Sequence, residues 1–121
     1  MIEFNDQFLV GPRPDHTVLA GKWEFPGGKV EPPESPPQAA VRECREETGC
    51  RVEVEKRLLM QTVQYDHGTV ELHFYLCRLS KEAASPLPHK PFQWVLRQDL
   101  HNYDFPSGNA QLIRMLVKGN G

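Results

Sequence analysis

The sequence lacks any long apolar run, and this absence argues against a membrane span. In 121 residues no apolar stretch approaches the roughly 20 residues that cross a bilayer. The opening segment, MIEFNDQFLV, also lacks the basic and then apolar pattern of a secretory signal. We therefore expect a protein that works away from membranes and forms one domain over residues 1–121.

The sequence also lacks a large excess of either positive or negative charge. The 14 Lys and Arg against 16 Asp and Glu give a net charge of −2. This balance provides no broad basic surface for duplex nucleic acid or for an anionic membrane. Any ligand that resembles a nucleic acid must therefore be small and held locally.

Cysteine is rare and does not suggest a disulfide framework. The three cysteines, Cys44, Cys50 and Cys77, are odd in number and form no C-x-x-C pair. They favour reduced, partly buried thiols in a cytoplasmic protein. The five histidines are scattered without metal-ligand spacing.

Residues 35–49, SPPQAAVRECREETG, predict a helix with clear ends. Ser35 suits the N-cap, Pro36 suits the first turn, and Gln38 completes an S-x-x-Q capping box. Gly49 suits the position after the last turn, where the backbone is often left-handed. The apolar stripe expected to face the core consists of Ala40, Val41, Cys44 and Thr48.

The remaining segments predict a mixed sheet and a second helix. Strands are predicted at residues 7–13, 51–65, 69–79 and 92–96. A C-terminal helix is predicted at residues 107–118, with an apolar face of Leu112, Ile113, Leu116 and Val117. Strands interleaved with two helices indicate an α/β (α+β) fold whose sheet is covered on both faces.

Three glutamates, Glu43, Glu46 and Glu47, share one surface of the first predicted helix, at positions i, i+3 and i+4. Each like-charged pair at this spacing costs roughly 0.2–0.5 kcal/mol. A solvated helix face is the simplest interpretation, since charged residues are mostly exposed. The preceding Gly27–Gly28 pair and the nearby acid Glu34 favour a cation site instead, because magnesium commonly takes one or two carboxylates together with phosphate oxygens.

The same segment resembles the Nudix box, G-x5-E-x7-R-E-U-x-E-E-x-G-U, where U is aliphatic. Gly28, Glu34 and the run from Arg42 to Cys50 supply all seven fixed Gly, Glu and Arg positions at the right spacing. Cys44 and Cys50 fill the two aliphatic positions as small hydrophobes. WEFPGGKVE (23–31) and DFPSGN (104–109) are similar to segments of the MutT branch, the oxidised-guanine nucleotide diphosphatases. The resemblance extends over nearly the whole chain.

The resemblance implies a Nudix-type α/β/α sandwich, with a mixed β-sheet between helices, and a metal site. The metal ligands would be the Gly27 carbonyl and the side chains of Glu43, Glu46 and Glu47. The metal would be Mg²⁺, with Mn²⁺ as an alternative. Glu43 or Glu34 would orient or deprotonate the attacking water. Arg42 would pair with a carboxylate of the box and fix its orientation.

The resemblance also implies a nucleotide site. Arg13 would contact the substrate, Phe25 would pack on the base, and Asn109 would hydrogen-bond to the base. Two simpler interpretations remain open at this point. Asn109 precedes a predicted helix and could serve as its cap, and Arg13 could be an exposed charge after a strand.

The reaction implied is hydrolysis of a nucleoside triphosphate to the monophosphate and pyrophosphate, with 8-oxo-dGTP as the first candidate. A second candidate is a Nudix hydrolase for CTP, dCTP derivatives or a nucleoside diphosphate linked to another group. A third is a non-catalytic Nudix-like recognition module, although such modules usually lose box glutamates and all are present here. The partner would be a small nucleotide, with a monomer or a weak homodimer left open.

Two departures from the family pattern bear on these expectations. The chain begins about ten residues late, so the family's first strand is expected to be missing or shortened, which would leave a sheet edge open or complete it from a partner chain. MutT proteins also carry an additional acid in the loop before the last strand. SPLPHKP (85–91) has none, so a fourth acid at the metal is not expected from that loop.

Overall fold

A computed structural model of the protein describes residues 1–14, 20–28, 30–66, 68–81 and 88–118. Its elements in chain order are β1 (Ile2–Phe4), β2 (Gln7–Pro12), β3 (Trp23–Glu24), α1 (Pro36–Thr48), β4 (Val52–Tyr65), β5 (Gly68–Leu79), β6 (Gln93–Leu96), the 3-10 helices η1 (Arg97–Asn102) and η2 (Ser107–Asn109), and α2 (Ala110–Lys118). The predicted strands and helices are present, although residues 107–109 of the predicted C-terminal helix form the 3-10 helix η2. Neither β1 nor η1 is predicted by the sequence. No helix among these residues is long and apolar enough to cross a membrane.

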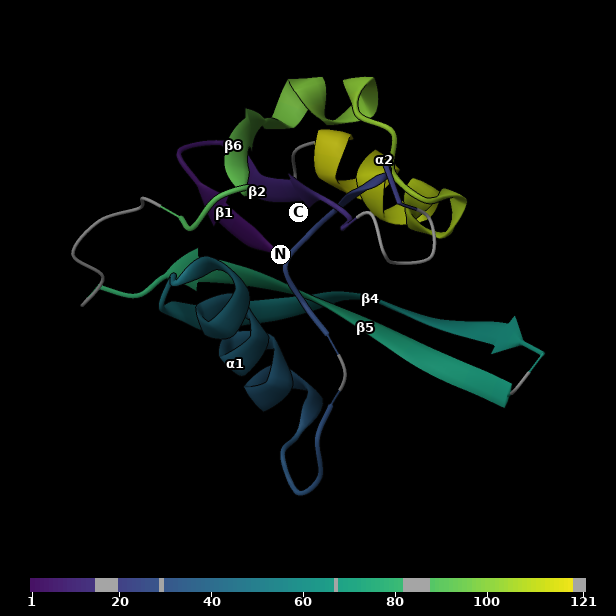
Figure 1. Ribbon diagram of the computed structural model, residues 1–121. Coiled ribbons are helices and arrows are strands. Elements are labelled where there is room, and N and C mark those ends of the chain that lie inside the picture. The colour runs from purple at the N-terminus through teal and green to yellow at the C-terminus, as the bar shows by residue number, and fades with distance from the viewer. Residues whose placement is uncertain (15–19, 29, 67, 82–87, 119–121) are drawn as a thin grey trace.

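The sheet is mixed, as predicted. Its strands follow the order β3-β2-β1-β5-β4, and β6 pairs with β2. β1 runs antiparallel to β2 and parallel to β5. This strand is only three residues long, but it lies between β2 and β5 rather than at an outer edge. β4 and β5 form a long antiparallel hairpin that extends past the other strands (Figure 1).

Two apolar clusters cover the two faces of the sheet. Residues of β2 alternate between them, because successive side chains of a strand point to opposite faces. Phe8 and Val10 pack with the helical residues Leu112 and Leu116 of α2. Leu9 packs with Cys44 of α1 in the other cluster. Figure 1 shows α1 and α2 on opposite sides of the sheet, so the predicted sandwich of helices around a mixed sheet is confirmed.

The ends of α1 form as predicted. The Ser35 side chain accepts a hydrogen bond from the backbone N–H of Gln38, and the Gln38 side chain accepts one from the Ser35 N–H. Gly49 adopts a left-handed conformation with φ 77°. Of the predicted apolar stripe, Cys44 and Thr48 are buried, whereas Ala40 and Val41 are only half-buried and Ala39 is buried as well. The core therefore lies slightly to one side of the stripe that the spacing predicts.

Arg97, which follows β6, joins three distant parts of the chain. Its guanidinium donates to Asp6 Oδ1 at 2.6 Å, to the Leu116 carbonyl at 2.8 Å and to the Glu3 carboxylate. It also lies 4.9 Å from the centre of the Phe8 ring. This residue ties the β1–β2 turn to the end of α2, and no sequence motif predicts its contacts.

Candidate active site

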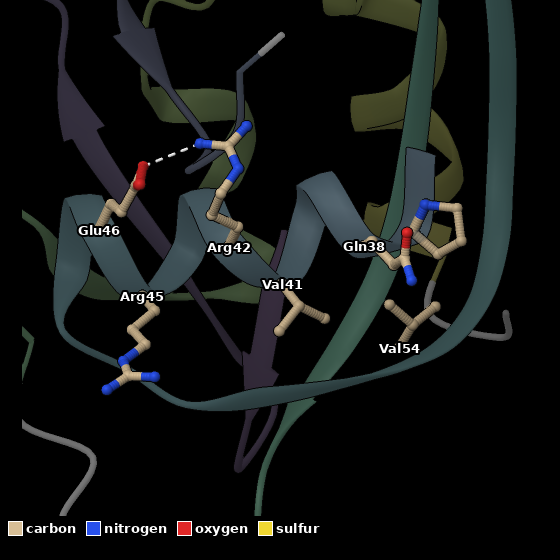
Figure 2. A pocket seen from close by; sticks show the side chains of 7 residues that line it. Gln38, Val41, Arg42, Arg45, Glu46 and Val54 are labelled. Atoms are coloured by element: carbon tan, nitrogen blue, oxygen red, sulfur yellow. Dashed lines mark hydrogen bonds and ion pairs between the residues drawn. The ribbon is translucent and has the colours of Figure 1, made fainter. Parts of the chain in front are cut away.

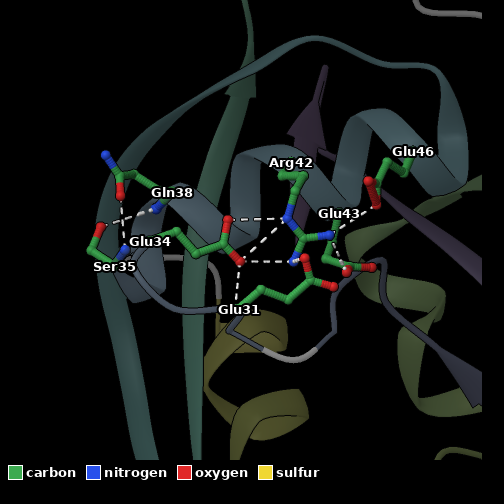
Figure 3. Close-up of polar contacts among 7 residues, drawn as sticks. All are labelled: Glu31, Glu34, Ser35, Gln38, Arg42, Glu43 and Glu46. Atoms are coloured by element: carbon green, nitrogen blue, oxygen red, sulfur yellow. Dashed lines mark hydrogen bonds and ion pairs between the residues drawn. The ribbon is translucent and has the colours of Figure 1, made fainter.

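Arg42 lies at the centre of the acidic face of α1. Its Nη1 donates to Glu43 Oε1 at 2.7 Å and to Glu46 Oε2 at 2.9 Å, while its Nη2 donates to Glu34 Oε1 at 2.8 Å. Its Nε also donates to both Glu34 oxygens, at 3.0 and 3.2 Å. Figure 3 shows the guanidinium between these side chains. One arginine therefore holds three carboxylates that would otherwise repel one another.

Glu34 is the most completely hydrogen-bonded of these acids. In addition to Arg42, its Oε1 accepts the backbone N–H of Glu31 at 2.8 Å. The hydrogen bonds from Arg42 and Glu31 hold the pKa of the Glu34 carboxyl below its usual range. Glu34 is thus a persistent anion whose oxygens are already engaged by the protein.

Glu43 lies directly against the backbone of Gly28. A Cβ atom placed on Gly28 would stand 2.6 Å from the carboxyl carbon of Glu43, which is closer than real Cβ atoms come to other atoms. The glycine of the box is therefore needed for space rather than for a left-handed backbone. It allows the loop before α1 to touch the carboxylate.

Glu47 closes the site on the side of the preceding loop. Its Oε2 accepts the backbone N–H of Gly27 at 2.8 Å. Burial raises the pKa of the Glu47 carboxyl to about 7, opposed by the Gly27 hydrogen bond and supported by the negative charges of Glu43 and Glu24. The protein thus holds Glu47 in a place where its negative charge is unfavourable unless a cation is bound nearby.

Arg13 and Glu24 form an ion pair at the site that the sequence does not predict. Arg13 Nη1 contacts Glu24 Oε1 at 3.0 Å. Burial raises the pKa of the Glu24 carboxyl, and the charge of Arg13 opposes this shift. Glu24 belongs to the WEFPGGKVE segment, but only its proximity to Glu47 in the fold marks it as part of the site.

Aromatic pairs hold the segment that contains Asn109 against β3. The Phe25 and Phe105 rings stack with centroids 5.0 Å apart, and Trp23 meets Tyr103 edge to face at 4.8 Å. The half-buried side chain of Asn109 makes no hydrogen bond with any part of the chain that the structure describes. The amide therefore does not cap α2, and it remains available for a ligand.

A separate groove lies between α1 and β4 (Figure 2). Its lining residues are Pro37, Gln38, Val41, Arg42, Arg45, Glu46 and Val54. Figure 2 shows Val41 and Arg45 on the side of α1 opposite to Arg42 and Glu46. Glu43 and Glu47 do not line the groove, so it borders the acidic site without containing it.

The donor set fits a divalent cation. Carboxylate oxygens are the hard ligands that such ions prefer, and Glu43 lies close enough to Glu47 to affect its ionisation. In the described ranges, no three acidic, histidine or cysteine side chains already converge as a metal site. The oxygens are instead engaged by Arg42, which binds Glu43 and Glu46, and by the Gly27 N–H, which binds Glu47.

The raised pKa of Glu47 predicts a pH-dependent cost in stability. Its folded pKa of about 7 lies above the unfolded value of about 4.3. The folded state therefore binds more protons between these values, and stability falls as pH rises through this window. With chelator at pH 8, we expect Glu47→Gln to raise Tm by about 3 °C, and the gain should disappear at pH 4.

Thermal unfolding at the two pH values measures this effect, with Glu53→Gln as the matched control. Glu53 is exposed on β4, and its substitution should leave Tm unchanged at both pH values. An equal gain for Glu47→Gln at pH 4 and pH 8 would mean that its charge is not the cause.

The fold and the site together define an α/β/α sandwich protein with an arginine-held acidic site on its first helix. Comparison with known families makes the class specific, since the NUDIX domain matches residues 1–115. The chain belongs to the Nudix hydrolase family. Its members generally use divalent metal ions and act on small nucleotide substrates.

Individual relatives agree on the family and differ in substrate. The chain is 41% identical over 117 residues to CTP pyrophosphohydrolase of Escherichia coli K12, covering 97% of this chain and 87% of that one. It is 31% identical over 116 residues to 8-oxo-dGTP diphosphatase of the same organism, covering 94% and 88%. The solution structure of the E. coli ORF135 protein matches with a TM-score of 0.75 at 28% identity, covering 98% and 86%. The predicted resemblance to the MutT branch is confirmed at the level of the family.

Proposed function

We propose that the protein hydrolyses a nucleoside triphosphate, with magnesium, to the nucleoside monophosphate and pyrophosphate, and that 8-oxo-dGTP is its preferred substrate. The observation that carries the choice of base is the half-buried Asn109 amide, which has no hydrogen-bond partner among the described residues. The acidic face of α1 supports the choice of reaction. The single domain over residues 1–121 is part of the same proposal.

The metal-binding residues would be Glu43, Glu46, Glu47 and the carbonyl of Gly27. A bound Mg²⁺ supplies neutralisation of phosphate charge and a more acidic water. The chain's own contribution is to hold these oxygens ready. Arg42 fixes Glu43 and Glu46 from one side, and the Gly27 N–H fixes Glu47 from the other.

Glu43 is the better candidate for orienting and deprotonating the attacking water. Glu34 accepts hydrogen bonds from Arg42 and from the Glu31 N–H, and its lowered pKa makes it a weak base. Glu43 accepts one contact from Arg42 and lies against Gly28. A proton released by the water would pass to the Glu43 carboxylate as the new phosphorus–oxygen bond forms and the bond to pyrophosphate breaks.

Base selectivity would come from Asn109, with Phe25 packing on the base. 8-Oxoguanine presents an N7–H donor where guanine presents an acceptor, and an amide can offer either its oxygen or its NH₂ group to such an edge. A site that hydrogen-bonds its substrate rejects analogues strongly, because the wrong base leaves polar groups unpaired. The stacked Phe25 and Phe105 rings support this role by fixing the segment that carries Asn109.

CTP hydrolysis is the second candidate, and one observation favours it. The relative with 41% identity is named CTP pyrophosphohydrolase, whereas the 8-oxo-dGTP diphosphatase of the same organism is 31% identical. Cytosine also offers an amide-like edge that an asparagine can recognise. The two candidate functions use the same acidic site and differ only in the base that Asn109 would recognise.

A nucleotide panel tests the proposal and separates the candidates. Pyrophosphate release is measured with magnesium for 8-oxo-dGTP, dGTP, CTP, dCTP and ADP-ribose. We expect the highest kcat/KM for 8-oxo-dGTP. Asn109→Ala should lower this preference over dGTP roughly 10–100-fold, the loss expected for one or two buried hydrogen bonds.

Asn102→Ala is the matched control, because Asn102 is exposed at the end of η1. An unchanged ratio of 8-oxo-dGTP to dGTP in Asn109→Ala contradicts base recognition by this residue. A higher kcat/KM for CTP than for 8-oxo-dGTP selects the second candidate. Nucleotide binding without pyrophosphate release from any substrate would instead indicate a recognition module.

A further inference from the structure

We propose that Glu24 is a positioning residue that holds Arg13 toward the phosphates of the substrate. The inference rests on the proposed function, and on the contact between Arg13 and the substrate that the family resemblance implies. It concerns how that contact is oriented, and it assigns a role to an acid outside the Nudix box.

The sheet fixes both partners of the pair. β2 and β3 run antiparallel, with Gly11 opposite Glu24 and Pro12 opposite Trp23. The pairing continues one step further, because the Arg13 N–H donates to the Lys22 carbonyl at 2.8 Å. The pairing of the strands therefore fixes the position of the Arg13 backbone relative to that of Glu24. Their 3.0 Å contact is made by side chains that are only 29% and 23% exposed.

The pair lies beside the acidic site. Glu24 is three residues before Gly27, whose N–H binds Glu47. The charge of Glu24 is felt at the Glu47 carboxyl, where it contributes to the raised pKa. A guanidinium held at this place would border the carboxylates that are proposed to bind the metal, which in turn would contact the phosphates.

The chemistry of the pair suits orientation rather than simple neutralisation. A guanidinium has five N–H donors in a rigid plane, and the contact with Glu24 is made through Nη1. Fixing one edge of that plane sets the direction of its other donors. An arginine held in this way loses less rotational freedom when it contacts a phosphate.

A double-mutant cycle tests the inference through the KM for 8-oxo-dGTP. Glu24→Ala should raise KM about tenfold and change kcat less, since one charge-assisted hydrogen bond orients Arg13. Arg13→Ala should raise KM at least as much, and the double variant should be no worse than Arg13→Ala alone. Glu24→Gln keeps an acceptor oxygen, so its KM should lie closer to wild type than to Glu24→Ala.

Glu55→Ala is the matched control, because Glu55 pairs with Arg78 on the β4–β5 hairpin, and its KM should equal that of the wild type. Additive effects of Arg13→Ala and Glu24→Ala would overturn the inference, as would an increase in KM from Glu55→Ala equal to that from Glu24→Ala. Thermal unfolding checks that each variant is folded. Calorimetry of nucleotide binding gives the same comparison without turnover, so a failure of the proposed hydrolysis is distinguishable from a failure of this inference.

Discussion

Replacing Glu46 with glutamine is expected to lower kcat for pyrophosphate release by about 1000-fold while leaving Tm nearly unchanged. Glu46 has 59% of its side chain exposed, compared with 18% for Glu43 and 16% for Glu34. Its contact with Arg42 at 2.9 Å joins neighbouring turns of one helix, and such exposed pairs contribute little to stability. Its proposed role is to bind the cation. Loss of several kcal/mol of transition-state stabilisation by that cation corresponds to a decrease in kcat of about 1000-fold.

The measurement is kcat under saturating magnesium and nucleotide, together with thermal unfolding. Glu53→Gln is the control, because it makes the same chemical change at an exposed position of β4 and should retain full activity. More than about a tenth of wild-type activity in Glu46→Gln would remove this residue from the metal site. A loss of Tm by several degrees would show instead that its contact with Arg42 supports the helix.

Features that depend on nearby residues were predictable from the sequence. The ends of α1 follow from contacts among Ser35, Gln38 and the helix backbone within three residues. Gly49 ends the helix by a conformation that glycine adopts without penalty. The i, i+3 and i+4 spacing placed the carboxylates on one face, and the structure shows Arg42 among them (Figure 3). These signals are local, so no knowledge of the fold was needed to use them.

Contacts between distant segments were not predictable in the same way. Arg13 and Glu24 are 11 residues apart and meet only because β2 pairs with β3. Arg97 meets Asp6 and Glu3 across 91 and 94 residues. The place of the short β1 inside the sheet also depends on its pairing with β5. No periodicity or cap within one segment records such pairings, so these members of the fold and the site appear only in three dimensions.

Burial on α1 shows how packing adjusts a correct local prediction. The helix and its ends agree with the sequence, but Ala39 is buried where Ala40 was expected. Spacing at 100° per residue fixes the width of an apolar stripe, whereas the position of its centre depends on the surface that the helix meets. Here that surface is the cluster around Leu9, Cys50 and Cys77.

Gly28→Ala is expected to lower kcat about 100-fold with almost no loss of stability. The new Cβ would stand 2.6 Å from the Glu43 carboxyl carbon, so one of the two must move. The flexible end of the glutamate is the easier part to displace. Gly28 is not among the glycines with positive φ, so alanine introduces no backbone strain and restricts the unfolded chain. The loss is therefore catalytic, because small displacements of a reacting group cost large factors in rate.

A cycle with Glu43→Gln shows whether Gly28 acts through Glu43. If the glycine serves only to let the carboxylate approach, Gly28→Ala combined with Glu43→Gln should be no slower than Glu43→Gln alone. Gly108→Ala is the control, because a Cβ at this position would meet no atom within 4 Å. This substitution should leave kcat unchanged. Multiplying losses in the double variant would mean that Gly28 serves the reaction by another route. Non-additive losses in kcat, with Tm retained, would show that glycine is required at this position of the box because it lets the Glu43 carboxylate approach the backbone.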